Sequence, residues 1–183
     1  MKKIILNITS SLDQRIAESD GGLEWLFEFP YREKTDSEPK DLLASVDTVL
    51  IGGRAYRELQ NMDVIWKFKE QTTYVVSYHD WGTEENLHYI TDNVIETISA
   101  LKKEQGKDIL LLGGGELISM LLAADLIDEM RITYIPVILG MGIPLFPKQP
   151  KESKWKLIEN KACKSGVLIV KYLKVTSFDI QSV

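Results

Sequence analysis

Gly113, Gly114 and Gly115 follow an apolar run at residues 109–112 and precede an apolar segment that looks helical. A run that is apolar throughout is typical of a strand buried on both faces of a sheet. Glycine has no Cβ, so the backbone amides of such a turn can approach a ligand closely. The start of the following helix adds unpaired N–H groups and a partial positive charge. The segment predicts a phosphate-binding turn, with a tight connection that binds nothing as the alternative.

The same pattern occurs earlier in the chain, where Gly52, Gly53 and Arg54 follow a second apolar run. Open α/β sheets bind ligands at the carboxyl ends of their strands, so two such turns could hold the two phosphates of a dinucleotide. Arg54 could add a bidentate phosphate contact, or it could form a structural pair with Asp47 or Glu58. Neither turn matches a P-loop or the Gly-x-Gly-x-x-Gly pattern, so the sequence requires a different dinucleotide fold.

Strands and helices alternate along most of the chain. Strands are expected at residues 3–9, 48–51, 73–77, 87–90, 109–112 and 130–137, and helices at 23–29, 41–44, 54–60, 94–105 and after the three glycines. Residues 155–160 and 167–175 flank a Lys-Ser-Gly turn and predict an antiparallel hairpin. The order predicts an α/β fold with a mostly parallel mixed sheet, flanking helices and an antiparallel C-terminal edge.

Three connections between these elements are expected to be irregular. They lie at residues 10–17, 31–40 and 138–146, and the second of them has the charge and proline content of a mobile surface loop.

The composition is typical of one soluble domain over residues 1–183, with 44% hydrophobic and 27% charged residues. A net charge of −5 argues against a nucleic-acid partner, and no apolar run is long enough to cross a membrane. Cys163 is the single cysteine, which excludes an intramolecular disulfide and favours a cytoplasmic location. His79 and His88 are interpreted as surface residues, and no metal site is expected.

Five segments resemble motifs of one family. Residues 11–17, Ser-Leu-Asp-Gln-Arg-Ile-Ala, resemble a Ser-Leu-Asp-Gly-Arg-Ile-Ala element, and residues 53–58, Gly-Arg-Ala-Tyr-Arg-Glu, resemble Gly-Arg-x-Thr-Tyr-Glu. The three glycines, Leu-Ile-Asp-Glu at 126–129 and Pro-Val-Ile-Leu-Gly-Met-Gly-Ile-Pro-Leu-Phe at 136–146 follow in the family's order. The chain therefore resembles the dihydrofolate reductase-like superfamily over nearly its whole length. Its similarity is to the branch that contains the C-terminal reductase domain of bacterial riboflavin biosynthesis.

The resemblance implies a dihydrofolate reductase-like fold and an enzyme that transfers a hydride from NADPH to a small nitrogen heterocycle, similar to 5-amino-6-(5-phosphoribosylamino)uracil reductase. It also implies a homodimer, with the terminal hairpin as a plausible contact. The implied cofactor residues are Thr9, Ile16 and Ala17 beside the nicotinamide, Gly53 and Arg54 at a phosphate, Val76, Ser77 and Tyr78 at the adenosine, and Gly113, Gly114 and Gly115 around the diphosphate. Trp25 and Thr133 are the candidate substrate residues.

The chain departs from the family pattern at positions that bear on the chemistry. Pro30 stands where dihydrofolate reductases carry an acidic residue, so dihydrofolate is disfavoured and no catalytic acid is identified. Tyr78 stands where an arginine would grip the 2′-phosphate, and Glu116 adds a carboxylate nearby. Arg54 and Arg57 could compensate, so NADPH stays favoured over NADH.

Two further departures, Gln14 for glycine and Tyr56 for threonine, could change how tightly the cofactor is enclosed. Two other functions remain open at this stage. One is a nucleotide-binding or sensing protein on the same fold without turnover, and the other is an enzyme of the dihydrofolate reductase type.

Overall fold

The computed structural model describes residues 1–29, 40–61, 68–80, 82, 85–147 and 152–175. Its strands are β1 (Ile4–Ser11), β2 (Arg15–Ala17), β3 (Val46–Gly52), β4 (Thr72–Val76), β5 (Leu87–Ile90), β6 (Asp108–Leu111), β7 (Glu129–Ile135), β8 (Ile143–Pro144), β9 (Trp155–Ala162) and β10 (Leu168–Lys174). Its helices are α1 (Glu24–Glu28), α2 (Lys40–Ser45), α3 (Gly53–Asn61), α4 (Val94–Lys103) and α5 (Gly115–Ala123).

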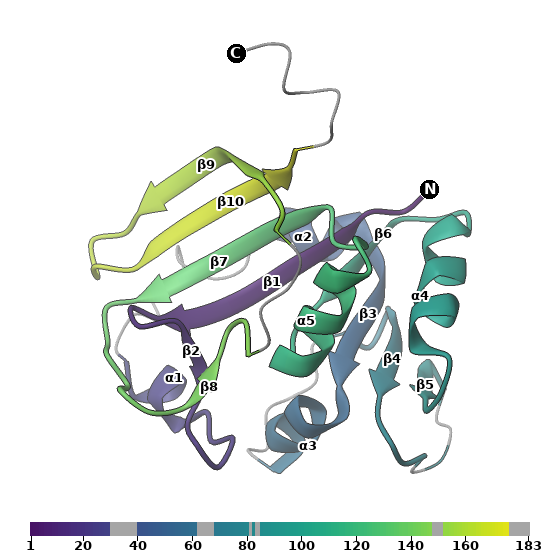
Figure 1. Cartoon of the computed structure of the whole chain (residues 1–183), viewed down its shortest axis with the longest axis horizontal. Coiled ribbons are helices and arrows are strands. Elements are labelled where there is room, and N and C mark those ends of the chain that lie inside the picture. The colour runs from purple at the N-terminus through teal and green to yellow at the C-terminus, as the bar shows by residue number, and fades with distance from the viewer. Residues whose placement is uncertain (30–39, 62–67, 81, 83–84, 148–151, 176–183) are drawn as a thin grey trace.

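An eight-stranded sheet in the order β5-β4-β3-β6-β1-β7-β10-β9 forms the centre of the molecule (Figure 1). All neighbours from β5 to β7 are parallel, and β10 and β9 complete the sheet as an antiparallel hairpin. The predicted α/β fold, with its mostly parallel mixed sheet and antiparallel C-terminal edge, is confirmed.

Helices cover both faces of this sheet because its central strands are apolar on both sides. Ile118 and Leu121 of α5 pack in one cluster with Leu6, whereas Leu42 of α2 packs against Ile5. Leu6 and Ile5 are consecutive in β1, and consecutive side chains of a strand point to opposite faces. The burial of both faces explains the apolar runs at residues 4–6 of β1, 49–51 of β3 and 109–111 of β6.

The connections expected at residues 10–17 and 138–146 are more regular than the sequence indicated. β1 continues to Ser11, and β2 pairs antiparallel with β8 in a small separate sheet. Residues 31–39 of the expected surface loop, and Pro30 before it, lie outside the described residues. The outer strand β9 exposes Leu157 and Ile158, and the homodimer contact expected at this hairpin stays a prediction.

A single carboxylate joins the turn after β1 to the loop before β8. Asp13 accepts hydrogen bonds from the Ser11 hydroxyl at 2.6 Å and from the amides of Leu139 at 3.1 Å and Gly140 at 2.8 Å. The bond from Ser11 and then those from the two amides hold the pKa of the Asp13 carboxyl below its usual value of 3.8, against a partial opposing effect of desolvation. The next residue, Gln14, adopts a left-handed conformation with φ of 59°.

Replacing Gln14 by glycine is expected to stabilise the protein. The other non-glycine residues with positive φ in the described part of the chain are Asn86, Asn93 and Asp125, types that tolerate this conformation better than glutamine does. Removing the left-handed strain of about 1–2 kcal/mol outweighs the chain entropy that glycine adds, about 0.5–1 kcal/mol. Gln14→Gly should therefore raise the free energy of unfolding by about 0.5–1 kcal/mol in urea titrations. Leu12→Gly, in the same exposed turn, is the control and should lower it.

Asp13→Asn should destabilise the fold in a pH-dependent way. The folded-state pKa of Asp13 lies below its unfolded value, so its contribution is present above pH 3.8 and is lost as the pH falls through the folded-state pKa. Thermal unfolding should therefore show a lower melting temperature for Asp13→Asn at pH 7, with a gap to the wild type that narrows below pH 3.8. Asp92→Asn, at an exposed position, controls for the change of charge. An equal difference in melting temperature between Asp13→Asn and the wild type at pH 7 and below pH 3.8 would contradict this role of Asp13.

Candidate functional site

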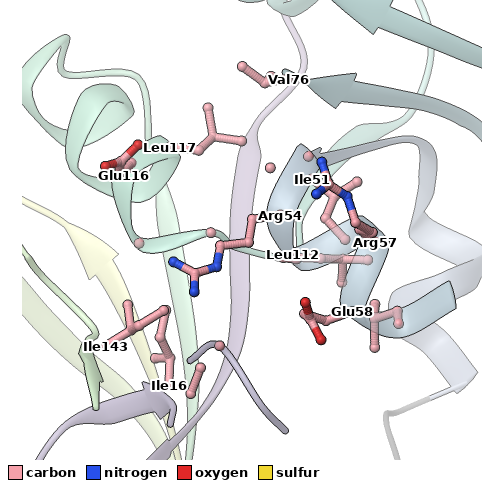
Figure 2. A pocket seen from close by; sticks show the side chains of 18 of the residues that line it. Ile16, Ile51, Arg54, Arg57, Glu58, Val76, Leu112, Glu116, Leu117 and Ile143 are labelled. Carbon is pink, nitrogen blue, oxygen red and sulfur yellow. The ribbon is translucent and has the colours of Figure 1, made fainter. Parts of the chain in front are cut away.

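A cleft of about 1180 Å³ opens where the parallel strands end and α3 and α5 begin (Figure 2). Single ligands of drug size commonly occupy pockets of about 300–1,000 Å³, so this cleft has room for a cofactor and a substrate together. Its walls come from β1, β3, β4, the start of α3, the start of α5 and the segment around α1. This is the carboxyl edge of the sheet, where the sequence placed the ligand.

The two glycine turns touch one another at the back of this cleft. Leu112 N–H donates to the Leu50 carbonyl at 2.9 Å, and Gly52 N–H donates to the Gly113 carbonyl at 2.9 Å, so the bonding between β3 and β6 continues into the turns. Gly114 has φ of 79°, and a Cβ on it would lie 3.3 Å from the Gly52 Cα. The absence of side chains lets α3 and α5 begin next to each other with their N-terminal amides at the same cleft.

Most of the residues predicted to bind the cofactor line the cleft. They are Thr9, Ile16, Ala17, Gly53, Arg54, Val76, Ser77, Tyr78, Gly114 and Gly115. Gly113 is buried behind its two neighbours and contributes its carbonyl to the contact between the turns. The structure thus brings together residues that lie far apart in the sequence, and their roles toward a cofactor stay predictions.

The end of β4 packs tightly against the start of α3. A Cβ on Gly53 would lie 2.8 Å from the Ser77 Cβ and 2.9 Å from the Ser77 Oγ, which allows only glycine there. The Ser77 Oγ accepts a hydrogen bond from the His79 amide at 3.1 Å. Tyr78 is 89% exposed and stands at the rim. This wall is therefore shaped by backbone proximity, with one hydroxyl and one exposed ring at its edge.

Arg54 reaches across the cleft, away from its own helix. Its Nη2 donates to the carbonyl of Asp20 at 2.6 Å. The alternative partner Asp47 binds Lys2 instead, at 2.7 Å, because Asp47 lies at the start of β3 and Arg54 follows its end. Glu58, the other alternative, is itself part of the cleft wall. Figure 2 shows the Arg54 side chain extending toward the side of the cleft that carries Ile16 and Ile143.

Apolar side chains form a second region of the cleft that the sequence did not reveal. Leu23, Leu26, Phe27, Ile51, Leu59, Phe68 and Leu112 line it, and Asn7 and Thr9 add polar groups from β1. Leu23, Leu26 and Phe27 are spaced as residues of one helix face, and this spacing was the sequence signal for the apolar region. Asn7 gave no comparable signal, because one polar residue within a strand does not show which face will be open.

The two candidate substrate residues do not line this cleft. Trp25 is only 5% exposed and lies within the protein interior, whereas its neighbours Leu26 and Phe27 line the cleft. Thr133 pairs with Thr9 in the neighbouring strand β7 and is partly buried. Helix geometry accounts for the position of Trp25, because residues 23, 26 and 27 share a face and residue 25 points away from it. The substrate roles of Trp25 and Thr133 stay predictions.

Charged side chains of both signs surround the cleft. Arg54 and Arg57 enter from α3, and Asp20, Glu58 and Glu116 supply carboxylates. Among the described residues, His, Cys, Asp and Glu side chains form no group that could hold a metal ion. None of the described helices has the length and apolar character needed to span a membrane.

The sequence model of the RibD C-terminal domain matches residues 2–169. The uncharacterised protein YwjB of Bacillus subtilis (strain 168) is 36% identical over 157 residues, covering 85% of this chain and 89% of YwjB. The uncharacterised protein YyaP of the same organism is 30% identical over 182 residues, covering 93% of this chain and 94% of YyaP.

Solved structures show the same fold. A protein from Shewanella sp. PV-4 that carries a provisional riboflavin biosynthesis name has a TM-score of 0.82 and 26% identity, covering 95% of this chain and 99% of its own. A diaminohydroxyphosphoribosylaminopyrimidine deaminase/5-amino-6-(5-phosphoribosylamino)uracil reductase from Thermotoga maritima has a TM-score of 0.69 and 16% identity, covering 95% of this chain and 57% of its own. Dihydrofolate reductase from Enterococcus faecalis, complexed with NADP(H), has a TM-score of 0.67 and 17% identity, covering 95% and 97%. The chain therefore belongs to the RibD C-terminal domain family, a reductase-type domain with the dihydrofolate reductase-like fold.

Proposed function

We propose that the protein is a reductase that uses NADPH to reduce a small planar nitrogen heterocycle, similar to 5-amino-6-(5-phosphoribosylamino)uracil. The observation that carries the proposal is the direct contact of the two glycine turns, through the bond from Gly52 N–H to the Gly113 carbonyl, at the wall of one large cleft. Two helix N-termini with no intervening side chains suit the two linked phosphates of a dinucleotide.

The residues of the cleft fit such a cofactor. A Cβ at Gly114 would press against the other glycine turn, and Arg54 brings a positive charge into the same cleft. Ile16 and Ala17 provide an apolar wall that would exclude water from the reacting ring. When bound, NADPH supplies the hydride, and the task of this chain is to orient the two reactants.

The apolar region of the cleft suits a flat heterocycle. Leu26 and Phe27 of α1 face it from one side and Leu59 of α3 also lines it. Asn7 and Thr9 on β1 are placed to give the ring polar contacts that fix its orientation. Membership in the RibD C-terminal domain family and the likeness to the Thermotoga maritima deaminase/reductase support a pyrimidine-type ring as the substrate. The NADP(H) complex of the Enterococcus faecalis enzyme supports NADPH as the cofactor.

Consumption of NADPH tests the proposal. The purified protein should oxidise NADPH steadily, monitored by loss of nicotinamide absorbance, when one of a panel of aminopyrimidines, pterins and flavin precursors is present. NADH should support a slower reaction because it lacks the 2′-phosphate that the arginines of α3 would attract. Binding of NADPH without turnover across the panel would instead indicate a sensing protein. No change in tryptophan fluorescence or melting temperature with either nucleotide would overturn the cofactor assignment itself.

A matched pair of glycine variants tests the phosphate turn. Gly114→Ala adds a methyl group 3.3 Å from the Gly52 Cα and disturbs the amides that would face the phosphates. Losing a hydrogen bond to a charged group is worth about 1.5–3 kcal/mol, so the Kd for NADPH should rise roughly 10- to 100-fold. Gly140→Ala is the control, since Gly140 has a similar φ of 73° with open space around a Cβ and does not line the cleft. Equal Kd values for the two variants would reject the turn as a phosphate site.

A further inference from the structure

The Arg54 guanidinium lies against Asp20 and Gly21 on the far side of the cleft, and these two residues are called its seat below. Its guanidinium donates through Nη2 to the carbonyl of Asp20 and lies directly over Gly21. A Cβ on Gly21 would lie 3.0 Å from the Arg54 Nε, 3.1 Å from Nη2 and 3.3 Å from Cζ. Gly21 also has φ of 99°, a conformation that side chains rarely adopt. A side chain at this position would be strained and would push the guanidinium out of its present position by at least a few tenths of an ångström.

The turn that carries this seat is held by its own hydrogen bonds. The Gly21 amide donates to the Glu18 carbonyl at 3.0 Å, and the Glu18 amide donates to the Gly22 carbonyl at 2.9 Å. The Gly22 amide donates to Asp20 Oδ1 at 2.9 Å. These bonds fix the Asp20 carbonyl in the direction of the cleft, so Arg54 meets a preformed acceptor.

We propose that Asp20 and Gly21 are positioning residues, which hold the Arg54 guanidinium extended across the cleft for a phosphate group of the dinucleotide. The inference rests on the proposed function, because NADPH supplies that phosphate. A carbonyl partner fixes the orientation of the guanidinium and leaves its positive charge in place. A carboxylate partner would neutralise that charge. Of the five N–H donors of a guanidinium, the bond to Asp20 uses one. An arginine that such a bond holds in one orientation loses less conformational entropy when it binds a ligand.

The seat also connects two parts of the proposed cofactor site. The turn at residues 18–22 directly follows β2, which carries Ile16 and Ala17, and Arg54 is the second residue of α3. The bond from Arg54 to Asp20 therefore joins the wall expected beside the nicotinamide to the helix expected at a phosphate. Binding at one part is coupled to the order of the other through a single side chain.

Gly21→Ala tests the proposal, with Gly82→Ala as its matched control. Gly82 has a similar φ of 102° and open space around a Cβ, so its variant reproduces the backbone strain without any contact. Gly21→Ala should raise the Kd for NADPH about tenfold in fluorescence titrations, the effect of about one charge-assisted hydrogen bond, and Gly82→Ala should not change it. Melting temperatures of both variants show how much of the effect is strain.

A double-mutant cycle shows whether Gly21 acts through Arg54. In an Arg54→Ala background, Gly21→Ala should change the Kd less than twofold, because the side chain that it displaces is already missing. Arg54→Ala should also weaken the salt dependence of NADPH binding, because it removes a charge from the site, and Gly21→Ala should weaken it to a smaller extent, because it shifts that charge. A merely structural role of Gly21 would leave that salt dependence as in the wild type.

Arg54→Lys gives a second measurement that does not depend on Gly21→Ala folding. Lysine keeps the charge but has no planar group to lie over Gly21, so the Kd for NADPH should rise by roughly threefold to tenfold. Wild-type affinity in Gly21→Ala or in Arg54→Lys would overturn the positioning role, as would equal effects of Gly21→Ala with and without Arg54. A wild-type protein that does not bind NADPH would overturn the proposed function as well, which separates the two failures.

Discussion

The contact between the two glycine turns is the constraint on which the rest of the site depends. The amide of Gly52 and the carbonyl of Gly113 extend the pairing of β3 and β6 beyond the ends of both strands. A side chain at Gly114 would press against Gly52, and one at Gly53 would press against Ser77. Because these glycines allow such close packing, α3 and α5 start next to each other, and the other walls of the cleft surround that edge.

The two regions of the cleft are built from different parts of the chain. The region expected to hold the cofactor consists largely of backbone at strand ends and helix starts, where close packing favours glycine at positions 53 and 114. The apolar region consists of side chains such as Phe27 of α1, Leu59 of α3 and Phe68, which precedes β4.

The sequence was a good guide to features that depend on local order along the chain. The apolar runs before Gly52 and Gly113 predicted the buried strands and the turns after them, and the hairpin of β9 and β10 followed from its own turn. Contacts between distant segments could not be predicted from the sequence, because no local pattern indicates that Arg54 binds the carbonyl of Asp20. Trp25 shows a different limit, because a helix as short as α1 has too few residues to establish which face is buried.

The position of β1 within the sheet has a consequence for how the chain acquires its structure. Ile4 pairs with Ile109 and Ile5 pairs with Glu129, so this apolar strand has both of its neighbours in the second half of the chain. On the ribosome, β1 emerges long before either partner exists. Sheets with such distant pairings fold slowly and leave apolar edges open to aggregation meanwhile. β1 can therefore complete its place in the sheet only after β7 has left the exit tunnel.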